Sequence, residues 1–327
     1  MIVNRIAGVI GAVIILTPLA GCGKDEVSQM KATTLWVNAA SQLTEEEGTE
    51  AAPFKTISKA LAEAAKGSLI IVKGGEYHEN IVLSDGITLK GQPREEADRP
   101  VITAADAGET VIVMRDTSTI EFLRVTGGKD GILVDVNTNA RIVNCEIVNN
   151  EDNGIFFKDA DERGNFAATV HIEGCLVSGN GDGIDLEGTK GVIRDCRLIN
   201  NRDDGLDYDG NTNLSVFNTE IRDNKDDGIE IRLKRNSIAH IEGNIITGNG
   251  EDGIEIINTP VKGKTSNQVT IVNNTIRENG RYGIGGVDQE TEEVKEGLLI
   301  EGVKFEGNTI EKNLKAEIAG ITKKVGS

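Results

Sequence analysis

The sequence is poor in aromatic residues and in positive charge. Only 3% of its 327 residues are aromatic, with one tryptophan and three tyrosines, which leaves few ring platforms for stacking against sugars. Asp and Glu number 53 against 35 Lys and Arg, so the formal net charge is −18 at pH 7. This balance excludes nucleic acid as a partner, because both molecules would be anionic. It also disfavours the unaided binding of any polyanion.

Proline is scarce as well, at 5 residues, whereas glycine is abundant at 39. Proline removes a backbone donor, and glycine adopts backbone conformations that are closed to other residues. Together these counts favour a fold with many tight, hydrogen-bonded turns. The four cysteines and three histidines do not have the spacing of a zinc motif.

An apolar run extends from Ile6 to Leu19 and is too short for a helix that spans a membrane. It follows a single cation, Arg5, and ends in small residues before Cys22, as a cleaved signal segment does. Leu19 to Cys22 resembles the lipobox of bacterial lipoproteins, which implies that Cys22 becomes the lipidated first residue of the mature chain. Gly23 stands where aspartate would favour the inner membrane. We therefore expect a lipid-anchored protein of the bacterial cell envelope, at the outer membrane.

The rest of the sequence is repetitive. Asp-Gly or an equivalent pair recurs every 22 to 30 residues, with glycine at positions 131, 154, 183, 205, 228, 253 and 283. A second column comprises Cys145, Cys175, Cys196, Thr219, Asn244, Asn274 and Asn308. Five residues after each of these stands an asparagine: Asn150, Asn180, Asn201, Asn224, Asn249, Asn279 and Asn313. A fixed offset that recurs this often predicts a repeat architecture.

Within each repeat, apolar and polar residues alternate as in half-buried strands, for example in GIDLE, GLDYD and GIEIR. Three short strands per repeat, separated by glycine and asparagine turns, predict an all-β fold, a right-handed parallel β-helix. Successive coils of such a solenoid stack at about 4.8 Å, so equivalent residues form columns. The first and third residues after each glycine are expected to point inward and the second outward. A sharp left-handed corner is expected where residues that tolerate it precede the cysteine column: Asn144, Gly174, Asp195, Asn218, Gly243, Asn273 and Gly307.

Upstream of the repeats, the stretch from Pro53 to Gly67 has helical spacing of its apolar residues. We predict that this helix covers the open end of the first coil, because an exposed coil edge invites further strand pairing. The expected segments are a signal peptide over 1–21, a tether over 22–33, an N-terminal strand and capping helix over 34–67, the β-helix over 68–313 and a C-terminal cap or tail over 314–327. We expect a monomer.

Three cysteines remain once Cys22 is set aside for the lipid. Because Cys145, Cys175 and Cys196 fall in one interior column whose later members are threonine and asparagine, we interpret them as stacked small side chains rather than as a disulfide framework. The alternative is a bond between Cys145 and Cys175, for which the coil spacing is within reach.

Several segments resemble the pectate-lyase-like superfamily of parallel β-helix proteins: Trp36-Val37, Pro53 to Ile57, Gly74 to Tyr77 and the coils that contain Gly-Ile. The resemblance extends over nearly the whole mature chain and implies the fold. It leaves the function open, because the superfamily contains lyases, hydrolases, epimerases, adhesive proteins and chains with no known activity.

Acidic residues gather in two of the predicted columns. The outward column reads Leu133, Phe156, Asp185, Asp207, Glu230, Glu255 and Gly285. The column before the glycines contains Asp130, Asp182, Asp204, Asp227 and Asp252. Two unit charges at about 4.8 Å repel by about 0.9 kcal/mol in bulk water and by about 3.5 kcal/mol at an effective dielectric near 20. Splayed side chains, raised pKa values, basic neighbours or a bound cation must relieve this repulsion, and clustered carboxylates are the ligands that calcium prefers.

The segment DDGLD, which includes Asp203, Asp204 and Asp207, resembles the calcium motif of family-nine pectate lyases. The resemblance implies a calcium site at these three residues, with Asp182 of the preceding coil as a fourth ligand. In that family calcium acidifies the proton beside a uronate carboxyl group, and a lysine removes the proton for β-elimination. Lys234, in the following coil, is the nearest candidate for this base.

Arg232 and Arg235, which flank Lys234, are candidates for holding a substrate carboxylate, and Asp185 and Glu230 lie on the same expected face. The alternative role of the basic cluster is charge balance. The segment DDGIE repeats the acidic motif one coil later, which predicts either a second ion or a repeat motif without catalytic meaning.

Three hypotheses follow from the sequence. The chain is a calcium-dependent lyase of acidic polysaccharide, a protein that binds calcium and cell-surface glycan without turnover, or a structural or adhesive scaffold. We favour a calcium-binding, carbohydrate-associated β-helix with a membrane link through the lipid anchor only.

Overall fold

The computed structural model describes residues 31–92, 98–136, 138–157, 169–188, 190–210, 213–234, 237–258, 267–288 and 303–321. These belong to one compact unit. The predicted signal peptide, Cys22 and Arg235 lie outside the described residues. In the ranges just given, no helix has both the length and the apolar composition that a membrane span requires.

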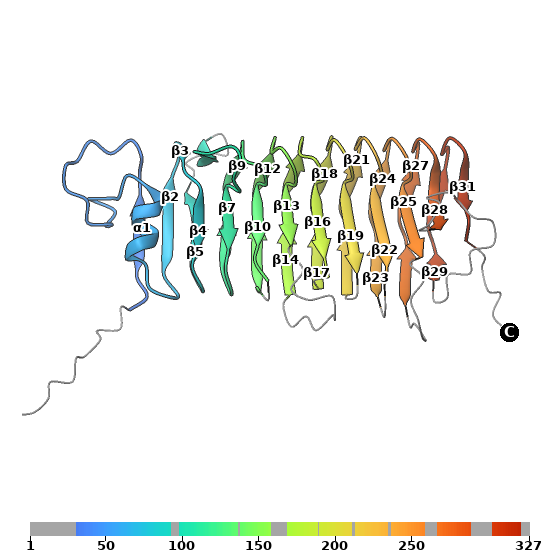
Figure 1. Cartoon of the computed structure of the whole chain (residues 1–327), viewed down its shortest axis with the longest axis horizontal. Helices are drawn as coiled ribbons and strands as arrows, with labels where there is room; N and C mark the ends of the chain where they lie inside the picture. Colours follow the sequence, from blue (N-terminus) through green and yellow to red (C-terminus); the bar gives the residue numbers. More distant parts are fainter. Residues whose placement is uncertain are drawn as a thin grey trace, which may run out of the picture. The chain divides into compact units, whose positions relative to one another are not determined.

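Three parallel sheets form the fold (Figure 1). Sheet A contains, in spatial order, β1 (Thr34–Val37), β2 (Leu69–Lys73), β5 (Thr88–Gln92), β8 (Thr119–Glu121), β11 (Ala140–Val143), β14 (Thr169–Glu173), β17 (Lys190–Arg194), β20 (Asn213–Phe217), β23 (Ile238–Glu242), β26 (Gln268–Val272) and β29 (Val303–Glu306). Sheet B contains β3 (Glu76–His78), β6 (Val101–Thr103), β9 (Arg124–Thr126), β12 (Glu146–Val148), β15 (Leu176–Ser178), β18 (Arg197–Ile199), β21 (Glu220–Arg222), β24 (Ile245–Thr247), β27 (Thr275–Arg277) and β30 (Thr309–Glu311). Sheet C contains β4 (Ile81–Leu83), β7 (Ile112–Met114), β10 (Ile132–Val134), β13 (Ile155–Phe157), β16 (Ile184–Glu187), β19 (Leu206–Gly210), β22 (Ile229–Leu233), β25 (Ile254–Asn258), β28 (Tyr282–Asp288) and β31 (Ala316–Ala319).

The chain passes through sheets A, B and C in turn and then enters the next coil, which confirms the predicted parallel β-helix. Equivalent strands of successive coils pair in register: Ile184 pairs with Leu206, and Leu206 pairs with Ile229. These residues are fully buried, and so are the residues two places further along each strand, such as Leu186 and Ile231. Burial of one such side chain stabilises the fold by about 1.5–3 kcal/mol.

The predicted left-handed corner is confirmed at all of its positions, where φ lies between 49° and 70°. A second left-handed corner, which was not predicted from the sequence, precedes the asparagine column. Its residues are Asn149, Gly179, Asn200, Asp223, Gly248, Glu278 and Lys312. Glycine and asparagine dominate both corners because they tolerate this backbone conformation.

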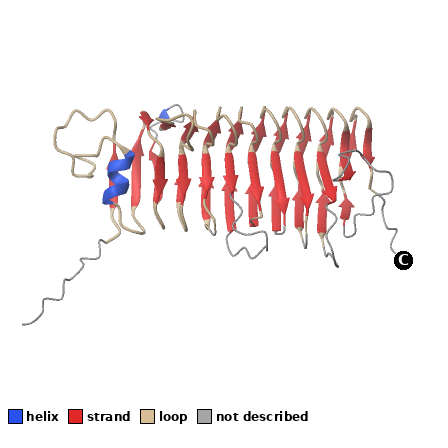
Figure 2. Ribbon diagram, in the orientation of Figure 1, coloured by secondary structure: helices blue, strands red, loops and turns tan. Residues whose placement is uncertain are grey.

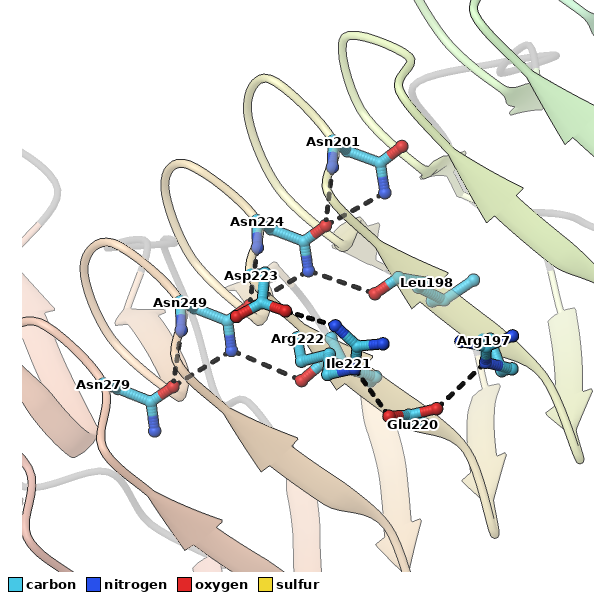
Figure 3. Close-up of polar contacts among 10 residues, drawn as sticks. All are labelled: Arg197, Leu198, Asn201, Glu220, Ile221, Arg222, Asp223, Asn224, Asn249 and Asn279. Atoms are coloured by element: carbon cyan, nitrogen blue, oxygen red, sulfur yellow. Dashed lines mark hydrogen bonds and ion pairs between the residues drawn. The ribbon is translucent and has the colours of Figure 1, made fainter.

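The asparagine column forms a buried hydrogen-bonded ladder (Figure 3). The backbone N–H and side-chain amide of Asn201 both donate to Asn224 Oδ1 at 3.0 Å, and the same groups of Asn224 donate to Asn249 Oδ1 at 3.2 and 3.0 Å. Asn224 Nδ2 also donates to the Leu198 carbonyl at 3.2 Å. A buried amide with partners on both sides avoids the cost of an unsatisfied polar group.

The cysteine column works in the same way, with sulfur as the acceptor. The Cys145 N–H donates to Cys175 Sγ at 3.5 Å, and the Cys175 N–H donates to Cys196 Sγ at 3.4 Å. All three thiols are free and buried, as the stacked interpretation predicted. The column continues with Thr219 Oγ1, which accepts from the Cys196 N–H at 3.3 Å.

Helix α1 (Ile57–Glu63) lies at the N-terminal end of the coils and packs against β1, β2 and β4 (Figure 2). Thr56 is its N-cap, and the Thr56 side chain accepts from the Lys59 N–H at 3.2 Å. Ile57 and Ala60 are buried in the same core as the first strands. The predicted capping helix is therefore present.

Candidate metal centre

The candidate site lies on the outer face of sheet C. Strand pairing there places one outward residue of each coil in a single row: Val82, Val113, Leu133, Phe156, Asp185, Asp207, Glu230, Glu255 and Gly285. The first four are apolar and the next four acidic. We call Asp185, Asp207, Glu230 and Glu255 the acidic strip. The predicted column is confirmed.

A second acidic row runs beside the strip, at the aspartates that precede the repeat glycines. Asp182 Oδ1 accepts from the Asp204 N–H at 3.0 Å, and Asp204 Oδ1 accepts from the Asp227 N–H at 2.7 Å. Asp227 Oδ1 accepts from the Asp252 N–H at 2.6 Å. We call these four residues the aspartate ladder. Each donor occupies one oxygen of its partner carboxylate, so the second oxygen remains for another interaction.

The glycine after each ladder aspartate is required by packing. A Cβ at Gly205 would lie 2.7 Å from both Asn224 Nδ2 and the Gly228 carbonyl oxygen. The recurring Asp-Gly pair thus combines a carboxylate that binds the next coil with a residue small enough for the corner. Its repetition is a property of the fold, whereas the acids of the strip are not needed for coil stacking.

Burial disfavours ionisation of the carboxylates of the strip and ladder, and the neighbouring acids add to the effect. Burial raises the pKa of Asp204 to about 9, and nearby carboxylates, led by Glu230, add to the rise. Burial and the charge of Glu230 also raise the pKa of Asp207 to about 8. Burial, followed by neighbouring acids, raises the pKa of Asp185 and of Glu255 to about 8. A cation that bound here would replace protons on these groups.

Three basic side chains contact this array or the residues beside it, and Arg281 Nε lies 3.6 Å from Asp252 Oδ1 of the ladder. Arg232 Nε lies 3.0 Å from Asp209 Oδ1, and its Nη2 lies 2.7 Å from Glu230 Oε1. Lys234 Nζ lies 2.8 Å from Asp209 Oδ2. At the other end, Arg281 pairs with Glu251 and its Nη1 lies 3.9 Å from Glu255 Oε1.

The donor set fits a hard cation. Oxygens that bind one Ca²⁺ at 2.3–2.6 Å lie within about 5 Å of one another. Among the described residues, three groups have ligand atoms within 4.8 Å of one another: Asp203, Asp204 and Asp226; Asp226, Asp227 and Glu251; and Asp227, Glu230 and Glu255. In addition, the buried atoms Asp207 Oδ1 and Asp252 Oδ2 have no hydrogen-bond partner.

The structure brings together part of the predicted calcium site. Asp203 and Asp204 share a group with Asp226, whereas Asp182 lies one coil back in the ladder and Asp207 stands in the acidic strip. Lys234 and Arg232 meet at Asp209. The assignment of calcium to Asp182, Asp203, Asp204 and Asp207 stays a prediction.

The structure adds Asp209 and Arg281 to the site, to which the sequence assigned no role, and it places Asp226, Asp227 and Glu255 of the predicted acidic columns within it. The repeats DDGIE and EDGIE signal three of them. Asp209 could have been found only from the strand register, which sets it opposite Arg232. For Arg281 the sequence offers no signal.

Two family models match the chain. The model described as a right-handed β-helix region matches residues 130–319. The model described as a Pel9A-like right-handed β-helix region matches residues 36–219, more than half of the chain. The chain belongs to the Pel9A-like right-handed β-helix family. This confirms the resemblance and the handedness that the sequence predicted.

The Pel9A-like match contains all four predicted calcium ligands and ends before Lys234. The family relationship therefore covers the acidic motif but not the predicted base. No curated protein matches the chain.

Solved structures with the same fold include pectate lyase Pel9A, with a TM-score of 0.61 and 16% identity over 91% of this chain and 80% of that one. An alginate lyase from Paenibacillus sp. str. FPU-7 has a TM-score of 0.64 and 16% identity over 89% of this chain and 99% of its own. The A-module of the Azotobacter vinelandii mannuronan C-5 epimerase AlgE6 has a TM-score of 0.61 and 18% identity over 81% and 73%. At these identities the likeness shows the fold alone.

Proposed function

We propose that this Pel9A-like β-helix binds calcium on sheet C and, through the bound calcium, an acidic polysaccharide. The observation that carries the proposal is the acidic strip beside the aspartate ladder, in which carboxylates of consecutive coils face one another. Asp203, Asp204 and Asp207 of one coil, with Asp182 of the coil before, would hold the ion. Asp185 and Glu230 flank this site along the strip.

Coordination chemistry explains why an acidic face would serve an acidic ligand. Calcium takes six to eight oxygen ligands, so an ion on three or four carboxylates keeps positions for further oxygens. A uronate carboxylate can fill them. Without the cation, the strip and the net charge of −18 repel a polyuronate. Binding should therefore require calcium.

A second candidate function is β-elimination by the same site. It is favoured by the meeting of Arg232 and Lys234 at Asp209, on the margin of the strip. Bound calcium would acidify the proton beside the uronate carboxyl group. Arg232, together with Arg235 outside the described residues, would hold a substrate carboxylate, and Lys234 would accept the proton. The glycosidic C–O bond at the β-carbon would then break as the C=C bond forms, and water would protonate the leaving oxygen. Lys234 is paired with Asp209 in the structure and would have to leave that carboxylate to reach a substrate proton.

Binding and cleavage are tested on the soluble chain from Gly23 onward with polygalacturonate and alginate, with calcium and with chelator. We expect calcium-dependent binding that Asp204→Asn weakens, because the amide retains the ladder acceptor but loses the charge. Glu220→Gln, on sheet B, is the matched control and should bind normally. Unsaturated sugar ends that disappear in Lys234→Ala would establish the lyase.

Retention of the polymers that is equal with calcium and with chelator would contradict the proposal. If neither polymer is bound under either condition and calcium leaves the protein's stability unchanged, the scaffold hypothesis is favoured instead. Binding without product in the presence of calcium would leave the protein as a calcium-dependent glycan-binding protein.

We also propose that Cys22 carries the lipid and holds the protein at the outer membrane of the bacterial envelope. The support is the lipobox resemblance of Leu19 to Cys22. Metabolic labelling with a fatty acid should mark the full-length chain and fail to mark Cys22→Ser. Fractionation of the labelled cells should place the chain in the outer membrane, and its recovery in the inner membrane would contradict the assignment.

A further inference from the structure

A separate group of carboxylates lies one coil beyond the DDGLD motif. Asp227 of the aspartate ladder and Glu230 and Glu255 of the acidic strip have ligand oxygens within 4.8 Å of one another. They share no residue with the group formed by Asp203, Asp204 and Asp226. Two ions at these two groups would share no ligand residue, whereas an ion at the intermediate group of Asp226, Asp227 and Glu251 would compete with both.

The residues of this second group are shielded from water. Asp227 is 4% exposed and Glu255 is 7% exposed, and only Glu230 is half-buried. Asp227 uses one oxygen for the Asp252 N–H and makes no ion pair within the part of the chain that the structure describes. Buried, mutually close carboxylates are costly unless a positive charge or protons compensate them.

An independent observation comes from Asp252, which is fully buried and whose Oδ2 has no hydrogen-bond partner. A Cβ at Gly285 would collide with this oxygen. Because Gly285 pairs with Glu255 in the strand register, Asp252 Oδ2 occupies the next position of the outward row, where glycine supplies no side chain. Burial raises the pKa of Glu255, and the charge of Asp252 adds to the rise. The oxygen therefore lies next to Glu255, at the edge of the group.

The neighbouring arginine side chains do not neutralise all of the carboxylates in this group. Arg232 pairs with Glu230 from one side, at 2.7 Å. Arg281 approaches from the other side: its Nη1 lies 3.9 Å from Glu255 Oε1, its Nε lies 3.6 Å from Asp252 Oδ1, and it also pairs with Glu251. Between them, Asp227 and Asp252 Oδ2 present oxygens without a cationic contact within hydrogen-bond distance.

We propose that sheet C holds a second calcium ion, bound by Asp227, Glu230 and Glu255 with Asp252 at its edge. Carboxylate oxygens from two adjacent coils at this spacing suit the larger, geometrically tolerant Ca²⁺ better than Mg²⁺, which demands a compact octahedron. This site is additional to the calcium site of the proposed function. The ions bound to the protein can be counted in the absence of polysaccharide.

The test is the number of calcium ions bound per chain, measured by calorimetric titration and by native mass spectrometry on the chain from Gly23 onward. We expect two ions for the unmodified protein. Glu255→Gln and Glu230→Gln should each retain one ion and lower the affinity for the other at least about tenfold. Asp203→Asn should show the reverse, retaining the second ion and losing the first.

Glu220→Gln on sheet B is the control and should retain both ions. Circular dichroism and thermal melting establish that each variant is folded, and Glu230→Gln, at a half-buried position, is the variant least expected to disturb the core. The inference is overturned if the unmodified chain binds a single ion that only Asp203→Asn removes, or if folded Glu230→Gln still binds two ions with unchanged affinity. Because no glycan is present, failure of polysaccharide binding would leave this result unaffected.

Discussion

Sheets B and C present outward residues at the same coil spacing but arrange charge in opposite ways. On sheet B, Arg197 Nε lies 3.0 Å from Glu220 Oε2, and Arg222 Nε lies 2.6 Å from Glu220 Oε1 (Figure 3). Arg124 pairs with Glu146 on the same sheet at 2.9 Å. On sheet C, acid follows acid through four coils.

The electrostatic consequence is opposite as well. Hydrogen bonds from Arg222 and then Arg197 hold the pKa of Glu220 below its usual range. Burial and the charges of Glu230 and Asp185 raise the pKa of Asp207 to about 8. Because one solenoid produces both patterns, the stacking of acids is not imposed by the fold. It is better explained by a ligand that brings the missing positive charge.

Removal of calcium should have the largest effect, and only sheet C should respond. A ligand at about 100 times its dissociation constant stabilises the folded state by about 2.7 kcal/mol per site, so two sites would contribute about 5 kcal/mol. We expect chelator to lower the melting temperature measured by circular dichroism. Glu220→Gln should show the same loss as the unmodified protein. An unchanged melting temperature in chelator would contradict the proposal that bound calcium stabilises sheet C.

The calcium-free protein should become less stable as pH rises. The pKa values of Asp185, Asp207 and Glu255 are about 8 in the folded chain, well above those of the unfolded chain. The folded state therefore binds more protons than the unfolded state between the two sets of values. The stability that these groups contribute is complete below about pH 4 and is lost as pH rises through about 8. Melting curves from about pH 5 to about pH 9 should show this decline, and calcium should reduce it.

Neutralising one residue of the acidic strip should change the free energy of unfolding in opposite directions without and with calcium. In calcium-free solution near pH 9, Asp207→Asn should raise the free energy of unfolding by about 1–3 kcal/mol, because it removes repulsion with Asp185 and Glu230. With calcium the same change should be neutral or destabilising, because a ligand is lost. Denaturant titrations in both solutions measure the two effects. A loss of stability in both would indicate that Asp207 is held by contacts within the protein.

The sequence predicted the columns of this fold because its regularities are local. Period-two alternation fixes which side chain points outward, and residues such as Gly174 and Asn218 mark the left-handed corner. The details of the site depend on contacts between coils. Nothing in the sequence indicates that Asp204 Oδ1 accepts a hydrogen bond from the Asp227 N–H, or that Asp209 pairs with both Arg232 and Lys234.

The predicted calcium ligands show the same limit. Residues of one coil, such as Asp203 and Asp204, could be grouped from their spacing. The partner from the next coil, Asp226, depends on how the side chains lie across the stack. The strand register determines the row to which a residue belongs. Which carboxylate oxygens lie close enough to bind one ion depends on the side-chain positions in the folded protein.

The smallest effect is expected on sheet B itself. Side chains of the Arg197, Glu220 and Arg222 cluster are 30–50% exposed, and exposed ion pairs contribute about 0.2–1 kcal/mol each. Glu220→Gln should therefore lower stability by about 1 kcal/mol or less, measured by denaturant titration, and high salt should reduce the difference. Its acid dependence should also oppose that of sheet C, because a depressed carboxyl pKa stabilises at neutral pH and loses that stabilisation as pH falls. A large, salt-independent loss would mean that the pairs of sheet B, and not only the carboxylates of sheet C, determine how this solenoid responds to its ionic surroundings.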